Sequence, residues 1–359
     1  MPSTALQHFI ITRLGIGIQN EDWFRSTLAL FEAVTFPSLR AQSCSDFTSL
    51  LIVGNDMPAS ARSRLSEIIS GHRNFHVVPI DLLDMRHVRH GCFDYVWNCC
   101  QEYLLANRLI ADPFSYIVTS VLDGDDALHR DTVALVRERA AAEMPEFLEA
   151  ERKYFTWRRH TGGMCLTFPD GLQWFAHPDV VQPMHCPCHS MSIFVAARFS
   201  SGISACSSRH SAWPFYCEVL GFKVVAAEAG RPMWVYVRHD RNEVPWQAEH
   251  SGSDQGCAEI PHGQFAIDFE KMEQWRRNRQ LRTAPAADAV PLSHDGMWAK
   301  EQLDTYFRIT ALNRQIAALE RQAEGGGLDA AGRALLEKQR ALRETLRGIY
   351  REQALSMFR

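Results

Sequence analysis

The 359-residue sequence predicts an α/β protein with a mostly parallel sheet, a mixed second lobe and a C-terminal α-helical hairpin. Three observations lead to this prediction. Between residues 8 and 142, short apolar strands alternate with helical patterns, and such alternation builds a parallel sheet with right-handed crossovers. Further strand patterns then follow with one short helix between them. From residue 298 onwards, apolar residues recur every three, four or seven positions, which is typical of helices.

The first half contains four strand patterns, each rich in β-branched and other apolar residues. They cover residues 8–14, 47–53, 76–80 and 117–122. Helical spacing predicts helices at 23–34, 58–69, 94–109 and 131–142, and Pro37 should close the first of them. Cys99 and Cys100 fall within the third helix and are expected to pack in the core.

The middle of the chain is less regular. Strands are expected at 153–157, 163–168, 190–197, 221–225 and 233–237, and a short helix at 212–220. The first two of these strands would form a hairpin through residues 158–162. Mixed strands after a parallel half predict a second lobe that receives a second substrate.

Composition divides the chain into an α/β domain at 1–283, a Pro- and Ala-rich linker at 284–297 and a helical hairpin at 298–359. In the hairpin, apolar residues step by three and four before the Gly325-Gly326-Gly327 break. Leu328, Leu335, Leu342 and Ile349 then recur every seventh residue and predict an apolar seam. The hairpin could fold back on the catalytic domain, form a homodimer, or touch anionic membrane through a basic face.

Charge and composition exclude several classes of protein. The 46% hydrophobic and 22% charged content is ordinary for a globular protein, and a net charge of −4 argues against a general nucleic-acid binder. No apolar run approaches the roughly 18 to 20 residues of a membrane span. The N-terminal residues lack an export signal, and ten irregularly spaced cysteines suggest reduced thiols. We therefore expect a cytoplasmic enzyme with at most peripheral contact at the inner face of the membrane.

An acidic turn, Asp123-Gly124-Asp125-Asp126, follows the fourth strand. Its clustered carboxylates repel one another, and a bound divalent cation such as Mg²⁺ or Mn²⁺ would offset that cost. The alternative is a turn that only caps the helix at 131–142. Ligands of parallel sheets bind at the carboxyl ends of the strands, where Arg13, Asp56 and the acidic turn fall. This placement favours the metal site.

Five pieces of sequence resemble the rhamnosyltransferase-like group of bacterial glycosyltransferases. They are HFIITRL with Trp23 and FEAVTFPSLRAQS, then FTSLLIVGND, LDGDDAL, FPDG at 168–171 and WVYVRHDRN at 234–242. They span roughly residues 8 to 242 in the family's order. The resemblance implies the GT-A fold, which binds nucleotide-sugars.

The resemblance also implies roles for particular residues. Asp123 and Asp125 would form an Asp-x-Asp metal element with Asp126 beside them, and His239 would approach the metal from the far side. Arg13, Asp56, Asp123 and Arg238 are the candidate nucleotide-sugar-binding residues. The family's usual Asp-Glu pair after the second strand is Asn55-Asp56 here, which leaves the choice of nucleotide open. The alternative for His239 is a surface histidine in a polar turn.

The implied chemistry needs a metal and a base. Carboxylate-held metal neutralises charge on the departing diphosphate, and inversion requires a general base for the acceptor hydroxyl. The position where many GT-A enzymes carry an acidic pair holds Arg209-His210-Ser211 here. His210 is therefore the first candidate base, with Glu218 and Asp170 behind it. The alternative is that His210 caps or packs near Ala212.

His185-Cys186-Pro187-Cys188-His189 contains four residue types that can bind zinc. In an extended chain these side chains alternate between faces, so they cannot converge on one ion. We expect a loop with incidental thiols.

The sequence therefore predicts a metal-dependent, inverting glycosyltransferase of hexosyl or rhamnosyl specificity. The donor would be a nucleotide diphosphate-sugar, and the acceptor a hydroxyl of a cell-surface polysaccharide or glycolipid. One alternative is an Asp-x-Asp phosphohydrolase or phosphotransferase, although that class carries its motif after the first strand. The other is a non-catalytic GT-A-like assembly module acting through the hairpin.

Overall fold

The structure is a computed structural model. It describes residues 6–81, 92–110, 112, 114–154, 163–177, 179–187, 189–207, 213, 217, 222–227, 229–239, 259–261, 263–280, 312, 316, 319–320, 322–323, 327 and 329–356. The chain divides into two compact units, Met1–Leu292 and Ser293–Arg359.

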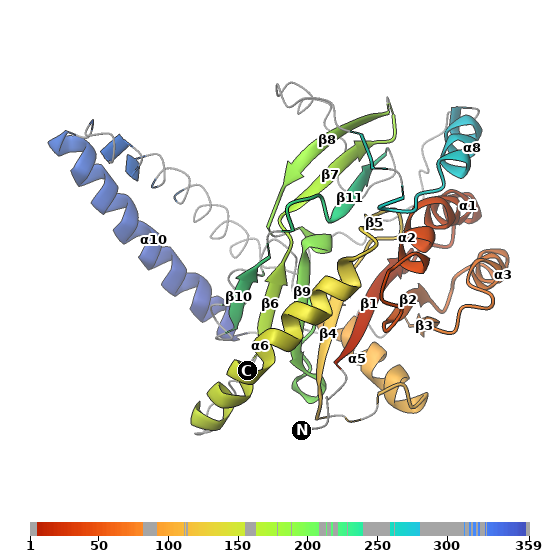
Figure 1. The fold of residues 1–359 in the computed structure, drawn as a ribbon, viewed down its shortest axis with the longest axis horizontal. Coiled ribbons are helices and arrows are strands. Elements are labelled where there is room, and N and C mark those ends of the chain that lie inside the picture. Colours follow the sequence, from red (N-terminus) through yellow and green to blue (C-terminus); the bar gives the residue numbers. More distant parts are fainter. Residues whose placement is uncertain are drawn as a thin grey trace. The chain divides into compact units, whose positions relative to one another are not determined.

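The larger sheet has seven strands in the order β10-β6-β9-β4-β1-β2-β3 (Figure 1). They are β1 (Gln7–Leu14), β2 (Thr48–Gly54), β3 (Phe75–Ile80), β4 (Tyr116–Val121), β6 (Met164–Thr167), β9 (Ile193–Arg198) and β10 (Lys223–Ala226). β9 runs antiparallel to β4 and β6, and the other pairs are parallel. The predicted α/β fold with a mostly parallel sheet is confirmed.

A second sheet of four strands has the order β5-β11-β7-β8. Its strands are β5 (Ala127–Leu128), β7 (Asp170–Phe175), β8 (Val180–His185) and β11 (Trp234–Arg238). β11 runs parallel to β7 and antiparallel to β5. This sheet is the mixed second lobe that the sequence predicts, although only β11 was expected as a strand.

Helices cover both faces of the larger sheet (Figure 1). The helices of this unit are α1 (Glu21–Leu30), the π-helical turn η1 (Phe31–Thr35), α2 (Phe36–Arg40), α3 (Ala59–Ile68), α5 (Cys92–Ala106), α6 (Thr132–Tyr154) and α8 (Phe269–Gln280). Among them, α8 packs on the second sheet, where Met272 and Trp275 join the cluster of Trp174 and Val237. Short 3₁₀ turns are η2 (Ser190–Ser192), η3 (Phe199–Ser201) and η4 (Ala205–Ser207). α1, α3 and α6 pack on one face, and α5 packs on the other.

The core explains why β1 reads as a continuous apolar run. Successive side chains of a strand point to opposite faces, so both sets must be apolar when helices cover both faces. Ile10 packs with Phe24 of α1, whereas Phe9 packs with Trp97 of α5. Cys100 is buried in the second of these clusters, as expected from its helical position.

Two predicted boundaries are wrong. Pro37 does not end the first helix, because the chain continues through η1 and Pro37 lies in the first turn of α2. Proline lacks the N–H that a regular helix interior uses, and the π-helical turn η1 directly before it is where the regular α-helical hydrogen-bond pattern is interrupted. Lys153 and Tyr154 belong to α6 rather than to a strand, because strong helix formers precede them. Most of the predicted helix at 212–220 lies outside the described residues.

In the second unit, α10 (Ala330–Ser356) packs against the helical residues that precede it. Ile316 contacts Leu336 and Leu319, and Arg340 donates to Glu320 at 2.7 Å. The predicted seam residues do not make the contact within the hairpin, and a homodimer seam formed by them stays a prediction. Its residues within α10 are 41–46% exposed, namely Leu335, Leu342 and Ile349, and Leu328 lies outside the described residues. Each helical residue turns by about 100°, so the one-residue step from Leu335 to Leu336 moves the apolar face.

Within the described parts of the chain, none of the helices combines the length and apolar character that a membrane crossing requires.

Candidate functional site

The acidic turn follows β4 and leads directly into β5. The turn is closed by a hydrogen bond from the Asp126 N–H to the Asp123 carbonyl at 3.3 Å. Gly124 faces β1 so closely that an added Cβ would lie 2.5 Å from a Leu14 methyl group. A glycine is therefore needed here for the turn to pack against the end of β1.

The first side chain of the turn faces the end of β1. Asp123 lies 3.7 Å from the Arg13 guanidinium, and both side chains are partly exposed. The Thr35 hydroxyl donates to the Asp123 carbonyl at 3.4 Å, which links the turn to η1. An ion pair this open to water is weak, so both groups remain available to a ligand.

Asp126 is fully buried and fastens the turn to β11. One carboxylate oxygen accepts the Val237 N–H at 2.8 Å, while the other makes no hydrogen bond within the described residues. Burial, and then the nearby Asp125 and Asp123, hold the pKa of Asp126 well above its usual range. The contact explains how a strand more than a hundred residues away is brought to the turn.

Asp125 meets His239 at the end of β11. The His239 Nε2 and an Asp125 carboxylate oxygen are 2.6 Å apart, and the histidine side chain is 5% exposed. The β5–β11 ladder makes this contact possible, since it pairs Trp234 with Leu128 and Val235 with Ala127. The structure thus brings together the two residues that the resemblance implies on opposite sides of a metal.

Tyr236 and Arg238 share one face of β11 because residues two apart in a strand point the same way. Arg238 donates to the Tyr236 hydroxyl at 2.8 Å, and its guanidinium lies 5.3 Å from the centre of the tyrosine ring. Burial first, and then Asp126, raise the pKa of Tyr236 to about 12, so its hydroxyl stays protonated. The ring of His189 lies 4.6 Å from that of Tyr236 and stacks on Trp234.

Tyr236 was not among the predicted site residues. The alternation within WVYVR could have indicated that Tyr236 and Arg238 lie together.

A family model described as "Putative rhamnosyl transferase" matches residues 17–250. The chain belongs to this family. The resemblance that the sequence indicated is confirmed, and the family is one of transferases. No curated protein matches the chain.

Solved structures resemble this transferase only distantly. A "putative nucleotide-diphospho-sugar transferase" from Desulfovibrio desulfuricans G20 is 8% identical, with 65% of this chain and 82% of that chain covered and a TM-score of 0.30. TarS from S. aureus is 11% identical, with 98% and 91% covered and a TM-score of 0.31. TarS has also been solved with UDP, at 10% identity, with 98% of this chain and 90% of that chain covered and a TM-score of 0.32.

The metal-binding potential of the transferase rests on few groups. No three His, Cys, Asp or Glu side chains of the described residues are arranged as a ready site for a metal ion. Asp125 and His239 nevertheless lie close enough to share one ion, and Asp126 keeps one oxygen without a hydrogen bond. Carboxylate oxygens and one imidazole fit Mn²⁺, whose shell phosphates and waters would complete.

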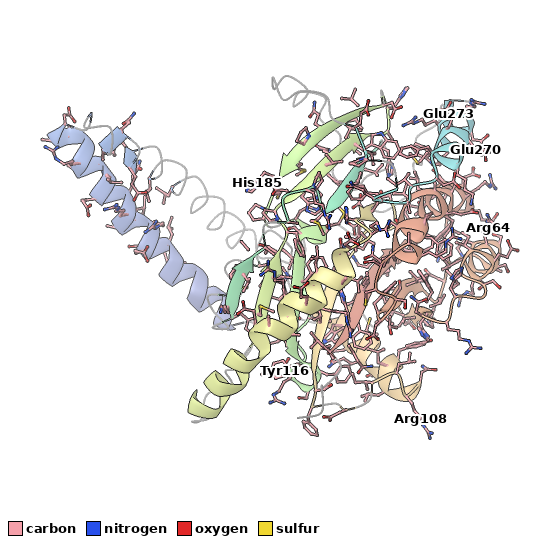
Figure 2. The ribbon with its side chains drawn as sticks, viewed as in Figure 1. Arg64, Arg108, Tyr116, His185, Glu270 and Glu273 are labelled. Atoms are coloured by element: carbon pink, nitrogen blue, oxygen red, sulfur yellow. The ribbon has the colours of Figure 1, made fainter. Side chains whose placement is uncertain are left out.

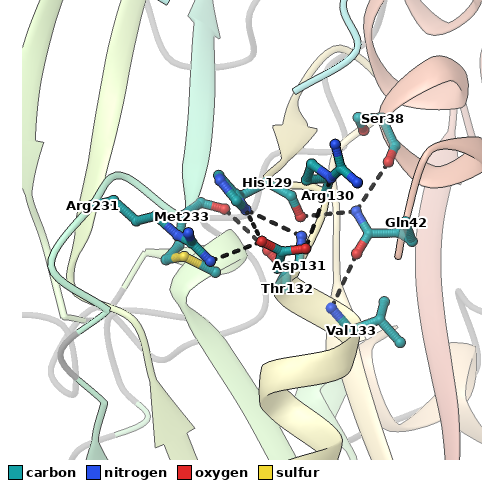
Figure 3. Close-up of polar contacts among 9 residues, drawn as sticks. All are labelled: Ser38, Gln42, His129, Arg130, Asp131, Thr132, Val133, Arg231 and Met233. Atoms are coloured by element: carbon teal, nitrogen blue, oxygen red, sulfur yellow. Dashed lines mark hydrogen bonds and ion pairs between the residues drawn. The ribbon is translucent and has the colours of Figure 1, made fainter. Parts of the chain in front are cut away.

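The capping alternative for the acidic turn is not supported by the contacts at the start of α6 (Figure 3). The Val133 N–H donates to Gln42 at 3.0 Å, and the same side chain donates to the Ser38 and His129 carbonyls. Asp131 pairs with Arg231 at 2.8 Å. Gln42 therefore caps α6 and ties it to α2, which leaves the acidic turn for another role.

Asp56 lies at the end of β2, where it accepts a hydrogen bond from Gln19 at 3.0 Å. Arg62 donates to the Asn55 carbonyl nearby at 3.0 Å. β1 separates β2 from β4 in the sheet, so Asp56 lies one strand away from the acidic turn. This position suits a contact to a distant part of a ligand such as its base.

Among the candidate bases, only Asp170 is described. It lies at the beginning of β7 and pairs with His185 of β8 at 2.8 Å; Figure 2 labels the histidine at the end of β8. The other end of β7 adjoins the site, because Phe175 pairs with Arg238. Asp170 therefore stands a strand's length from the acidic turn. His210 and Glu218 lie outside the described residues.

The expected loop with incidental thiols is only partly correct. His185 ends β8, and the buried His189 stacks on Trp234. Cys188 lies outside the described residues. An isolated pattern of letters could not show that His189 belongs to an aromatic cluster beside the acidic turn.

Proposed function

We propose that this transferase is a metal-dependent, inverting glycosyltransferase. It would move a hexosyl or rhamnosyl group from a nucleotide diphosphate-sugar to a hydroxyl of a cell-surface polysaccharide or glycolipid. The observation that supports this proposal best is the 2.6 Å contact between Asp125 and His239, which joins the end of β4 to the end of β11. Two elements that are distant in sequence thus present metal ligands to each other.

The proposed roles follow from position. Asp123, Asp125 and His239 would hold Mn²⁺ or Mg²⁺, and the imidazole nitrogen favours Mn²⁺. Asp126 would be the remaining ligand of the set while fastening β11 through the Val237 N–H. The metal, when bound, neutralises negative charge that develops on the departing diphosphate.

The remaining groups act on the donor and the acceptor. Arg13 and Arg238 reach the site from two strands, and a guanidinium binds phosphate oxygens in pairs. Asp56 would contact the nucleoside. A general base must remove the acceptor proton, and His210 is the first candidate, followed by Glu218 and Asp170. The position of Asp170 at the far end of β7 makes it the weakest of the three.

The proposal includes a cytoplasmic location, with at most peripheral contact at the inner face of the membrane. The seven cysteines whose side chains the structure describes are free thiols, which suits a reducing compartment.

Two other functions compete with this proposal. A phosphohydrolase or phosphotransferase of the Asp-x-Asp type fits poorly, because the acidic turn follows the fourth strand and the family is one of transferases. An assembly module acting through the hairpin is favoured by the exposed apolar residues of α10, which could also serve a homodimer.

Calorimetric titration with UDP, GDP and dTDP, each with and without Mn²⁺, tests the proposal. We expect at least one nucleotide to bind, and to bind more tightly with Mn²⁺. Absence of any nucleotide response would favour the assembly module.

A further inference from the structure

α8 lies beyond the residues that the family model matches, yet it reaches the candidate metal site. The ring of Trp275 meets the ring of His239 edge to face, with centroids 5.7 Å apart and an interplanar angle of 73°. Both residues are nearly buried, at 5% and 7% exposure. The His239 ring, which contacts Asp125, therefore packs against an aromatic ring of α8.

Trp275 is itself held in place. Its indole N–H donates to the Ser26 hydroxyl of α1 at 3.0 Å. A buried indole N–H needs such a partner, so the hydrogen bond sets the rotation of the ring as well as satisfying the donor. The Trp275 ring that packs against His239 is therefore hydrogen-bonded to α1, the helix that packs on β1.

Other side chains of α8 contact η1 and the second sheet. Lys271 pairs with Glu32 of η1 at 2.9 Å. Arg276 pairs with Asp179 beyond β7, and its guanidinium lies 5.2 Å from the centre of the Trp174 ring. These contacts join the helix that carries Trp275 to η1 and to the second sheet.

A histidine ring can rotate about two side-chain bonds, and a metal ligand must present one nitrogen in one direction. Trp275 packs against one side of the His239 ring, while the Nε2 atom of that ring contacts the Asp125 carboxylate. We propose that Trp275 is a positioning residue that holds His239 in the orientation for metal binding. This inference rests on the proposed function, since it assumes that His239 binds the metal.

The test measures Mn²⁺ and Mg²⁺ affinity by calorimetry in an equimolar mixture of UDP, GDP and dTDP. The variants are Trp275→Leu, His239→Ala and the two together. Phe269→Leu is the matched control, because Phe269 lies on α8 but packs against Trp174 rather than against His239. Thermal unfolding of each variant separates lost packing from lost metal binding.

We expect Trp275→Leu to lower Mn²⁺ affinity about 10-fold, as is typical when the support of a metal-bound histidine is removed. Mg²⁺ affinity should fall less, because an imidazole contributes less to Mg²⁺. The double variant should bind Mn²⁺ no more weakly than His239→Ala alone, since both changes remove one interaction. Phe269→Leu should leave both affinities unchanged.

Two milder variants keep the test valid if Trp275→Leu does not fold. Trp275→Phe and Ser26→Ala each remove the indole hydrogen bond while leaving an aromatic ring beside His239. Each should lower Mn²⁺ affinity about 2- to 5-fold, and together they should do no more than either alone.

The outcomes distinguish the two proposals. Normal Mn²⁺ affinity in His239→Ala would refute its metal role and this inference with it. Reduced affinity in His239→Ala, with Trp275→Leu behaving like Phe269→Leu, would overturn only the positioning role. Additive losses in the double variant would likewise show that Trp275 acts on something other than His239.

Discussion

The two sides of the candidate site are built differently. On the β4 side, consecutive residues form the acidic turn, and Asp123 and its partner Arg13 are partly open to water. Where the turn meets β11, Asp126 and His239 are buried and depend on contacts between elements far apart in the chain. The open groups therefore face a ligand, whereas the buried groups also hold β11 against the turn.

This difference separates binding from stability. Changing a partly exposed group of the site should lower ligand affinity and leave the free energy of unfolding unchanged. Changing a group that holds β11 against the turn should affect both, because a buried polar atom then loses its partner. The following variants test that separation.

Asp125→Asn should have the largest effect on binding. Removing this carboxylate should lower Mn²⁺-dependent nucleotide affinity about 100-fold, since a metal ligand is lost. The apo protein should be as stable as before or slightly more so, because an asparagine oxygen can still accept a hydrogen bond from His239 while the acidic turn loses a repelling charge. Calorimetry and thermal unfolding measure the two quantities, and unchanged nucleotide affinity would contradict the assignment.

Asp126→Ala should have its main effect on stability rather than on binding. The Val237 N–H would lose its acceptor, and the free energy of unfolding should fall by about 1 to 3 kcal/mol. Asp123→Asn is the matched control at a partly exposed group, where stability should change by less than about 0.5 kcal/mol. Urea titrations of both variants measure this. Equal losses would mean that the two sides do not differ as described.

Tyr236→Phe should have a smaller effect, confined to binding. The substitution removes the hydroxyl that accepts from Arg238 while keeping the ring under the guanidinium. Because Arg238 then loses one constraint, nucleotide affinity should fall about 3- to 10-fold with little change in stability. If the free energy of unfolding falls by more than the free energy of nucleotide binding, Tyr236 serves to hold β11 against the turn rather than to bind the ligand.

α10 also has exposed and buried apolar residues, and changing an exposed one should have the smallest effect on stability. Leu342→Glu changes an exposed residue, so the stability of the hairpin should fall by less than about 0.5 kcal/mol. Leu336→Glu, at the buried seam with Ile316, should unfold the packing of the two helices. Helix content by circular dichroism distinguishes them. Light scattering of Leu342→Glu shows whether a homodimer needs the exposed stripe.

The strand and the acidic turn on the β4 side could be located from the sequence because their signal is local. An uninterrupted apolar strand followed by three carboxylates is contained within a few residues, and the parallel sheet places strand ends together. β8 escaped prediction, since VVQPMH contains a proline and is mostly half-exposed on an outer strand. α8 escaped as well, because its buried Met272 and Trp275 are surrounded by charge.

The β11 side could be predicted only in part. The resemblance implied that His239 approaches the metal, but the support from Trp275 depends on the packing of α8, which no local pattern encodes. The seam of α10 shows how sensitive a periodic pattern is. Leu335 and Leu336 are both leucines, and only the packing of Ile316 decides which one is buried.

The central claim is that Asp125 and His239 bind one divalent ion from two elements. Electron paramagnetic resonance of bound Mn²⁺, with the protein labelled at histidine nitrogen and a diphosphate nucleotide present, tests it most directly. We expect hyperfine coupling from one histidine nitrogen that disappears in His239→Ala. A spectrum without histidine coupling, or one unchanged in His239→Ala, would contradict the claim.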